Sequence, residues 1–479
     1  MAQQAVTPQS TDFSAWYNDI VYKADLAATS PVRGCIIIKP YGYELWEGIR
    51  NGLDRRFKAT GHQNAYFPLF IPESYLKREA EHVEGFSPEL AVVTIAGGKE
   101  LEEPLVVRPT SETIIGEAFS QWIQSYRDLP LLINQWANVV RWELRTRPFL
   151  RTTEFLWQEG HTAHIDEADA EAETLQMLDI YAQLATDDGA IPVIKGRKSD
   201  REKFAGALRT YTIEGMMGDK KALQCGTSHN LGQNFARAFD IKYVDVNNNL
   251  QFCWTTSWGM STRMVGAVVM AHGDDKGLRL PPVLAPIQVV IVPIYKNDAE
   301  KTPVLDTVAR IKKELAAAGV RVHVDNRDSV SPGFKFNDWE MRGVPVRMEI
   351  GPKDVEKNNA VLARRDMGKE GKQFVSQDGL AQRVQDLLKD VQANLLRQAT
   401  EFRDANIHDV KSYDEMKQVV EAGGWARGWW GGTGDDEGRI KEETGATIRC
   451  FPFEQPGGTG KCFMTGQDAP QVALFARAY

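Results

Sequence analysis

The chain has few cysteines and no long hydrophobic run. Its five cysteines are odd in number and scattered over 479 residues, so a disulfide framework is not expected. No apolar stretch approaches the length that spans a bilayer, and the N-terminal segment MAQQAVTPQSTDFSAW lacks the apolar centre of a signal peptide. We therefore expect a reduced, cytoplasmic protein with no membrane partner.

The chain also lacks an excess of positive charge. It has 57 Lys and Arg against 65 Asp and Glu, a net charge of -8 and a pI of about 5.7. This balance argues against a DNA-coating protein, and no DNA partner is expected. It does not exclude RNA or nucleotides, because locally gathered charge steers binding more than net charge does. With 42% apolar and 25% charged residues and no repeats, the sequence is typical of a soluble enzyme of two to four domains.

Positive charge gathers in the segment VRWELRTRPFLRTTEFLWQEGH. Here Arg141, Glu143 and Arg145 alternate with bulkier residues, which predicts a strand with these side chains on one face. Pro148 predicts a turn, and Arg151 is expected on the returning strand. A row of guanidiniums suits a polyphosphate, because each planar fork can bind two oxygens. The simpler alternative is a solvated hairpin with surface ion pairs.

Hydrophobic periodicity predicts the elements of the first 283 residues. The expected helices are Tyr41–Gly61, Glu112–Ser125, Glu167–Thr186 and Met264–His272. The expected strands are Ala65–Phe70, Leu105–Arg108, Ile241–Val246 and Gln251–Thr256. Most of His164–Leu223 reads as helical. Thr110 or Ser111 is expected to cap the helix that begins at Glu112.

The pattern changes after Leu280-Pro281-Pro282. Strand, helix, strand, helix and strand follow one another between Ile287 and Ile350, which predicts an α/β unit with parallel strands. A long helix follows Asp378, and a Trp- and Gly-rich module begins near Asp409. The predicted domains are residues 1–283, 284–400 and 401–479.

Three segments carry a family resemblance: RPTSE at residues 108–112, EFLWQEGHTAH at 154–164, and QCGTSHNLGQNF with WGMSTR between Gln224 and Arg263. In this order they resemble the substrate loop, motif 2 and motif 3 of class II aminoacyl-tRNA synthetases. The combination is similar to that of the prolyl-tRNA synthetases of the archaeal/eukaryotic-like type, over nearly the whole chain. The resemblance implies an α/β and α+β multidomain protein: an antiparallel-sheet catalytic domain, an α/β anticodon-binding domain and a small α+β C-terminal domain. It also implies a homodimer, joined through the Tyr41–Gly61 helix and the strand that contains Pro68.

The implied reaction joins proline and ATP into prolyl-adenylate and then passes proline to the 3′ end of tRNA(Pro). In the first step a carboxylate attacks a phosphate, so neutralising charge and aligning the two anions is the main task. The resemblance assigns the α-phosphate to Arg141, the adenine amino group to Glu143, and the adenine ring and outer phosphate to Arg263. Mg²⁺ is expected on the phosphates near Glu143 or Gln224. The implied ATP-binding residues are Arg141, Glu143, Arg151, Thr152, Gln224, Thr227, Ser261 and Arg263.

The resemblance also implies a proline pocket. Thr110 and Glu112 match the loop that binds the ammonium group, and Phe155 and Trp157 would enclose the ring. The complete implied set is Thr110, Glu112, Arg141, Phe155, Trp157, Glu159, His161 and His229. The alternatives are an aromatic core, a structural histidine and a first-turn helix charge. Cys225 is expected to be a small buried residue and not a nucleophile.

In the second domain the resemblance implies a binding site for anticodon bases. Such bases are unstacked, so protein side chains can stack on them and form hydrogen bonds with their edges. An ordinary charged surface is the alternative. The candidates are Phe336, Glu340, Arg347, Lys353 and Arg364.

The C-terminal module departs from the family pattern, in which four cysteines often hold zinc. The four positions here are Gly431, Asp436, Cys462 and Thr465, so one cysteine remains, and Cys450 could add a second. A closed site needs four ligands, so no structural zinc is expected. Packing of Trp425, Trp429 and Trp430 is expected to replace it.

Two further expectations concern accuracy and the chain end. A small pocket cannot strongly exclude alanine, and His164–Leu223 is too short to hold the editing domain that bacterial-type relatives insert there. We therefore expect no editing of alanyl-tRNA in cis. Ala478-Tyr479 matches the family's ending, whose terminal carboxylate approaches the active site.

Three other functions remain open on the sequence alone. A class II synthetase for threonine or histidine would share the motifs, although the zinc ligands of the threonyl enzymes are not evident. A non-catalytic tRNA-binding paralogue would have no need for Arg141, Glu143 and Arg263. An adenylate-forming enzyme with another acceptor is disfavoured by the apparent anticodon domain.

Overall fold

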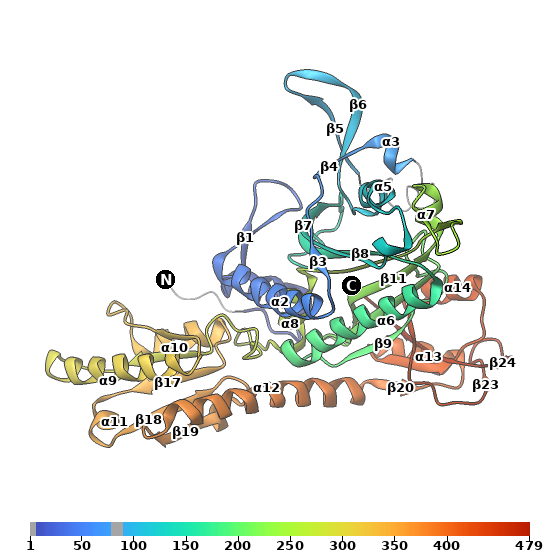
Figure 1. Cartoon of the computed structure of the whole chain (residues 1–479). Coiled ribbons are helices and arrows are strands. Elements are labelled where there is room, and N and C mark those ends of the chain that lie inside the picture. Colours follow the sequence, from blue (N-terminus) through green and yellow to red (C-terminus); the bar gives the residue numbers. More distant parts are fainter. Residues whose placement is uncertain (1–5, 78–89) are drawn as a thin grey trace.

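A computed structural model describes residues 6–77 and 90–479. The central element of the fold is an eleven-stranded sheet, in which the strands have the order β20-β21-β25-β22-β9-β10-β11-β14-β8-β7-β3. An α/β domain lies at one end, and helix α12 (Leu380–Ala405) runs from it along the molecule to the C-terminal module (Figure 1). None of the described helices has both the length and the apolar character needed to cross a membrane.

The catalytic part of this sheet is antiparallel, as predicted. Its strands β7, β8, β14, β11, β10 and β9 pair in that order. Their bounds are Leu131–Val140, Glu154–His164, Trp254–Ser261, Ala222–Gly232, Arg209–Met216 and Val193–Arg197.

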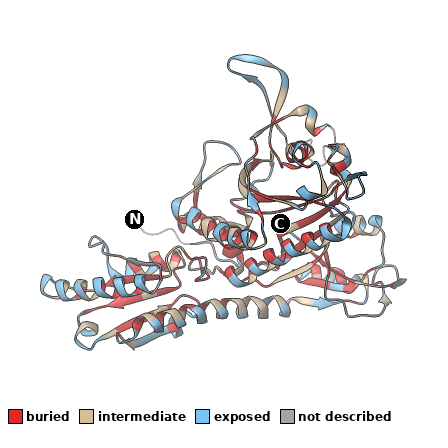
Figure 2. Cartoon of the chain, viewed as in Figure 1, coloured by how far each residue is buried: buried red, intermediate tan, exposed pale blue. Residues whose placement is uncertain are grey.

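Helices cover one face of the sheet, and their apolar sides form the largest core. They include α1 (Phe13–Lys23), α2 (Pro40–Ala59), α6 (Glu167–Gln183) and α8 (Arg263–His272). The expected α2 stripe is confirmed, because Leu45, Ile49, Leu53 and Phe57 are at most 1% exposed. Figure 2 shows these buried faces turned toward the sheet.

Smaller elements surround the sheet. The pair β1 (Ala27–Thr29) and β2 (Ile36–Ile38) precedes α2, and α5 (Glu112–Trp122), shorter than predicted, packs on α7 (Asn234–Ala238). The predicted hairpin is confirmed as β12 (Lys242–Val244) and β13 (Leu250–Phe252). A three-stranded sheet of β4 (Phe70–Pro72), β5 (Ala91–Ala96) and β6 (Lys99–Val107) projects from the domain (Figure 1), and the short helix α3 (Glu73–Leu76) follows β4.

The predicted strand Ala65–Phe70 is wrong. The ladder ends at β3 (Gln63–Asn64) and begins again at β4, and Pro68 lies in the connection between them. Proline lacks the N–H that a ladder needs, so the chain leaves the sheet here.

The expectation that His164–Leu223 is mostly helical is wrong beyond residue 188. After α6 and one π-helical turn (Leu184–Asp188), the chain forms β9 and β10. Seven of the eight β10 residues are buried, because the strand lies inside the sheet with both faces covered. Such a strand lacks the alternation that identifies a half-exposed one.

The predicted strand through Arg141, Glu143 and Arg145 is also wrong. The ladder between β7 and β8 ends at the pair Val140–Glu154, and the chain turns away. The intervening Trp142 and Leu144 are 52% and 86% exposed, so the alternation reflected a solvated loop. The predicted turn at Pro148 is present, closed by a bridge between Arg147 and Arg151.

The second domain confirms the predicted α/β unit. Its parallel strands are β16 (Val322–Val324), β15 (Val289–Pro293) and β17 (Val346–Ile350), connected by α9 (Asp298–Ala317) and α10 (Pro332–Met341). The antiparallel strands β18 (Asn359–Arg364) and β19 (Lys372–Ser376) extend the sheet, and α11 (Pro352–Glu356) links β17 to β18. Helix α12 continues past residue 400, so the predicted boundary there falls within a helix.

The C-terminal module continues the catalytic sheet. Strand β22 (Thr447–Pro452) pairs with β9, and β25 (Val472–Ala476), β21 (Trp425–Trp429) and β20 (Ile407–Asp409) follow. A buried ion triad of Lys198, Glu214 and Arg449 crosses this junction, with N–O distances of 2.8 and 3.0 Å. The remaining elements are α13 (Tyr413–Glu421), α14 (Gly434–Thr444), β23 (Gly460–Lys461) and β24 (Asp468–Ala469).

Candidate active site

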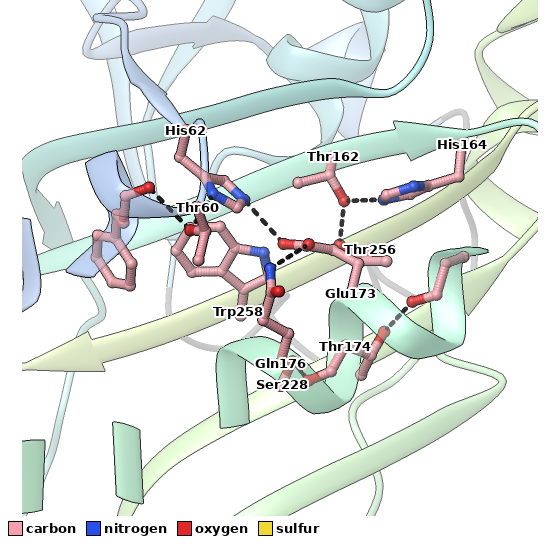
Figure 3. A network of polar contacts seen from close by, with 12 residues as sticks. Thr60, His62, Thr162, His164, Glu173, Thr174, Gln176, Ser228, Thr256 and Trp258 are labelled. Carbon is pink, nitrogen blue, oxygen red and sulfur yellow. Dashed lines mark hydrogen bonds and ion pairs between the residues drawn. The ribbon is translucent and has the colours of Figure 1, made fainter. Parts of the chain in front are cut away.

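Successive side chains of strand β8 point to opposite faces of the sheet and enter two different polar environments. Phe155, Trp157, Glu159 and His161 line a cavity on one face of the sheet. Side chains in between face the opposite side, where Thr162 bonds both His164 and Thr256 (Figure 3). Because successive strand residues point to opposite faces, β8 alone supplies half of the predicted proline set to one cavity.

The cavity collects every predicted proline-binding residue. Thr110 and Glu112 reach it from the loop before α5, and His229 reaches it from β11. It is also lined by Gln224, Thr227, Ser261 and Arg263 of the predicted ATP set.

A second cavity adjoins the first. The two share Arg141, Phe155, Ser261 and Arg263, and the second adds Glu143, Arg151 and Thr152. Thus the predicted ATP residues divide between two connected cavities. Arg145 lines neither of them, unlike Arg141, Glu143 and Arg151 of the same segment.

Arg141 is held at the border of the two cavities. Its Nε donates to the Pro109 carbonyl at 3.0 Å. Its guanidinium lies over the Phe155 and Trp157 rings, at 5.6 and 5.3 Å from their centroids. These contacts orient the guanidinium at the border of the two cavities.

Arg263, at the start of α8, donates to two neutral carbonyls, those of Leu150 at 3.3 Å and Gln224 at 3.5 Å. Burial and the neighbouring charges of Arg151 and Arg141 lower the pKa of Arg263 to about 10. The guanidinium remains charged at neutral pH, in a field that favours an anion. We call Arg141, Arg151 and Arg263 the pocket arginines.

Trp157 and Ser257 also point to a ligand. Among the described residues, no hydrogen-bond partner is present for the buried Trp157 Nε1 or Ser257 Oγ. Both residues line the first cavity. Native cores pair nearly all such groups, so these atoms are suited to contact a bound molecule or water.

The pKa values of the two cavity histidines shift in opposite directions. Burial would lower the pKa of His161, but its bond to Glu159 and the charges of Glu112 and Glu159 raise it overall. Burial and the His161 charge instead lower the pKa of His229 to about 4. His229 Nδ1 lies 2.9 Å from Thr210 Oγ1, and its ring stacks on Phe204 at 4.6 Å.

Sequence reasoning missed Glu202, Phe204, Thr210 and Ser257, which also line the first cavity. The first three lie in the stretch that was read as helical. The predicted cap is also wrong, because no side chain caps α5. Cys225 is buried, and burial raises the pKa of its thiol to about 12, which agrees with a non-nucleophilic role.

The oxygen donors of the site are compatible with Mg²⁺ on a bound triphosphate. Glu143 lines the second cavity and Gln224 the first, among three arginines. No group of three or more His, Cys, Asp or Glu in the described segments could hold a metal by itself. Mg²⁺ takes few protein ligands and completes its octahedron with phosphate oxygens and water, so this donor set fits.

The C-terminal residue docks beside the site. Its backbone N–H donates to Ala222 on β11, and its hydroxyl donates to Asp219 at 2.7 Å. The Arg147 guanidinium lies 5.4 Å from the Tyr479 ring.

The anticodon candidates do not share one environment. Arg347 lies 4.0 Å from the Phe336 ring and pairs with Glu349, and Lys353 is exposed. Arg364 is instead 6% exposed, and its guanidinium pairs with Asp366 and Asp390. Glu340 lies nearer the catalytic domain, 3.4 Å from Lys276.

In the C-terminal module, Trp425 and Trp430 are buried as predicted, and Trp429 is partly buried. Trp430 contacts the Phe463 and Phe475 rings. Although burial opposes it, hydrogen bonds from Thr465, Gly431 and Met464 lower the pKa of Cys462.

Comparisons with known families match all three parts of the chain. The family model of the tRNA synthetase class II core domain (G, H, P, S and T) matches residues 93–272. The anticodon binding domain matches residues 288–387, and the prolyl-tRNA synthetase C-terminal domain matches residues 413–479.

Relatives match over the full length. The proline–tRNA ligases of Roseiflexus sp. (strain RS-1) and Roseiflexus castenholzii are each 60% identical over 482 residues, covering 100% of both chains. The chloroplastic/mitochondrial proline–tRNA ligase of Arabidopsis thaliana is 59% identical, covering 100% of this chain and 89% of its own.

Proposed function

The chain belongs to the prolyl-tRNA synthetases, and we propose that its two adjoining cavities carry out the proline–tRNA ligase reaction. The enzyme activates proline with ATP and transfers it to tRNA(Pro), releasing AMP and diphosphate. The observation that carries the site assignment is the shared border of the cavities. Arg141 and Arg263 lie there, between the predicted proline and ATP residues.

In the activation step the pocket arginines neutralise the approaching anions. Arg141 reaches both cavities, so it can hold the proline carboxylate and the α-phosphate together. Arg263 and Arg151 hold the outer phosphates, with Thr152 beside them, and Glu143 accepts from the adenine amino group. Gln224, Thr227 and Ser261 complete the ATP site.

Mg²⁺, when bound, neutralises the triphosphate further. Glu143 and Gln224 are the residues proposed to hold it, directly or through water. No protein general base is required, because the attacking proline carboxylate is already ionised.

Proline binds with its ammonium group against Thr110 and Glu112 and its ring against Phe155 and Trp157. Glu112 is 7% exposed and lines the cavity, which suits pairing with a cation. Glu159, His161 and His229 form the back of the cavity.

ATP–pyrophosphate exchange without tRNA, run with all twenty amino acids, tests this assignment. We expect Mg²⁺-dependent exchange with proline. Exchange with threonine or histidine alone would keep the class and overturn the substrate. If no amino acid supports exchange with or without tRNA, the paralogue is the better explanation.

We also propose the archaeal/eukaryotic-like subtype without editing in cis. Residues between β8 and β11 form α6, β9 and β10, which all pack on or in the catalytic sheet. Stable alanyl-tRNA(Pro) in the presence of the enzyme is expected, and its rapid hydrolysis would refute the proposal.

A homodimer is proposed through α2 and the segment around Pro68. This side of the sheet ends in the exposed two-residue strand β3, and Tyr66 is 71% exposed. Sedimentation equilibrium should give twice the chain mass, and a monomer at micromolar concentration would contradict this.

For the anticodon, Phe336, Arg347 and Lys353 remain the proposed contacts, by stacking and charge. Arg364 is engaged in a buried ion pair and Glu340 faces the catalytic domain, so we assign them structural roles. Arg347→Ala should raise the KM for tRNA and leave proline exchange unchanged.

The remaining proposals concern metal and compartment. We propose that the C-terminal module holds no zinc, since Cys462 is the one cysteine at the four ligand positions and a hydrophobic core that includes Trp430 packs the module. Elemental analysis that finds one zinc per chain would refute this.

Five free cysteines support a reducing compartment, the cytoplasm.

A further inference from the structure

Glu159 makes an unusual set of contacts for a residue in a substrate cavity. Its Oε1 accepts from Ser111 Oγ at 2.5 Å and from Gln135 Nε2 at 2.9 Å. Its Oε2 accepts from Ser111 N at 3.1 Å and lies 3.2 Å from His161 Nε2. A carboxylate has about four lone-pair sites, so these contacts occupy its accepting capacity.

The contacts converge on the loop that carries the proposed ammonium site. Ser111 lies between Thr110 and Glu112, and two of the four bonds fix its backbone and hydroxyl. Gln135 pairs with Glu159 across β7 and β8, and its Oε1 accepts from Phe67 N at 2.6 Å. The loop is thereby tied to the ladder between β7 and β8.

The hydroxyl of Ser111 bonds Glu159 and does not cap the helix that it precedes. It occupies the N-cap position of α5, where a serine hydroxyl normally accepts from the helix, yet no such bond is present. A serine cap is worth about 1 kcal/mol. Departures from local preference of this kind are expected where function requires them.

We propose that Glu159 is a positioning residue, which with Ser111 and Gln135 holds Thr110 and Glu112 in place for the ammonium group of proline. This inference rests on the proposed function and deepens it. Ser111 and Gln135 become determinants of amino-acid affinity without contacting the amino acid.

The test is proline-dependent ATP–pyrophosphate exchange by Ser111→Ala and Gln135→Met, with KM measured for both substrates. Each lost donor is expected to raise the proline KM about tenfold, as for other hydrogen bonds to charged groups. The ATP KM should stay within about twofold, because the pocket arginines are untouched.

A matched control is available on the opposite face of the sheet. There Glu173 pairs with His62 at 2.8 Å, buried like Glu159 but lining neither cavity (Figure 3). Glu173→Gln should lower Tm without changing the proline KM. If Ser111→Ala and Gln135→Met behave like this control, the network is merely structural and the proposal is overturned.

A double-mutant cycle separates positioning from direct contact. If Ser111 acts through Glu112, the Ser111→Ala/Glu112→Gln enzyme should have about the proline KM of Glu112→Gln alone. If the two substitutions instead multiply each other's effect on the proline KM, Ser111 and Glu112 act independently and the proposal is overturned. Failure of the proposed function is distinguishable, because the wild-type enzyme would then show no proline-dependent exchange.

Discussion

Two groups of cationic side chains lie close together in this enzyme: the buried ion triad and the pocket arginines. They differ in the groups that accept their hydrogen bonds. In the buried ion triad, Glu214 accepts from both Lys198 and Arg449. The hydrogen bonds of Arg263 instead go to neutral carbonyls. Both groups are near enough to Cys225 that Glu214 and Arg263 each act on its pKa. Thus a carboxylate of the protein compensates the cations that join the two domains, whereas the guanidinium of Arg263 is bonded to neutral groups at the proposed substrate site.

The difference also explains how the C-terminal module is attached. Arg449 lies on β22, and its partner Glu214 lies on β10 of the catalytic sheet. With the continuous strand pairing, this makes the module part of the catalytic domain's framework. The anticodon domain has a separate five-stranded sheet and is attached through side-chain contacts such as Arg365–Asp274 and Gln392 to Asp188.

The largest effect is expected from Arg263→Ala. Loss of one charge that stabilises the transition state should lower kcat for exchange about 10³-fold. Tm should not fall, because the arginine lies in a field of like charge. Arg145→Ala, outside both cavities, is the matched control and should retain exchange. A large loss of Tm in Arg263→Ala would show that the pocket arginines are structural.

A smaller effect, on stability, is expected from Glu214→Gln. It leaves two buried cations without their counter-charge, which costs about 3 kcal/mol or more. Urea unfolding should show this loss. Replacing all three charges, as Lys198→Met/Glu214→Leu/Arg449→Met, should recover most of it. A Glu214→Gln enzyme of unchanged stability would remove the contrast between the two groups.

Pyrophosphate should stabilise the wild-type enzyme, since it brings negative charge to a site where the charges of Arg141 and Arg151 act against that of Arg263. At ten times its Kd, binding adds about 1.4 kcal/mol to the folded state. The increase in Tm should disappear in Arg263→Ala and persist in the variant with an apolar triad. Equal shifts in all three proteins would place the anion elsewhere.

The smallest expected difference is in acid stability. Although burial opposes it, the charges of Arg449 and Lys198 lower the pKa of Glu214 below its usual value. The unfolded chain therefore takes up this proton first, and the stabilisation is lost as pH falls from about 4.5 through the folded-state pKa. Unfolding free energy should fall less steeply over this range in the variant with an apolar triad. Identical slopes would contradict the role of Glu214.

Some features could be predicted because short-range physics decides them. Helix α2 follows from its four-residue apolar spacing, and the parallel unit of β15, β16 and β17 follows from alternating strands and helices. The proline and ATP candidates followed from motifs, and the structure brings them into two adjoining cavities. The errors lie where tertiary context overrides local pattern. Strand β10 is buried on both faces, and the arginine alternation falls in a loop.

The sequence by itself therefore determined which side chains are available: the arginines, the RPTSE loop, the alternation along β8 and the single cysteine at the four positions expected to correspond to zinc ligands of the family. Only the tertiary structure decided which of these charges are compensated. Arg263 and Arg364 look alike in sequence, yet Arg263 borders the proposed substrate cavity and Arg364 is paired with Asp366 and Asp390. Ser111 looks like a helix cap, yet its hydroxyl bonds Glu159. The partner of a polar group depends on distances between segments far apart in the chain, and these exist only once the sheet has formed.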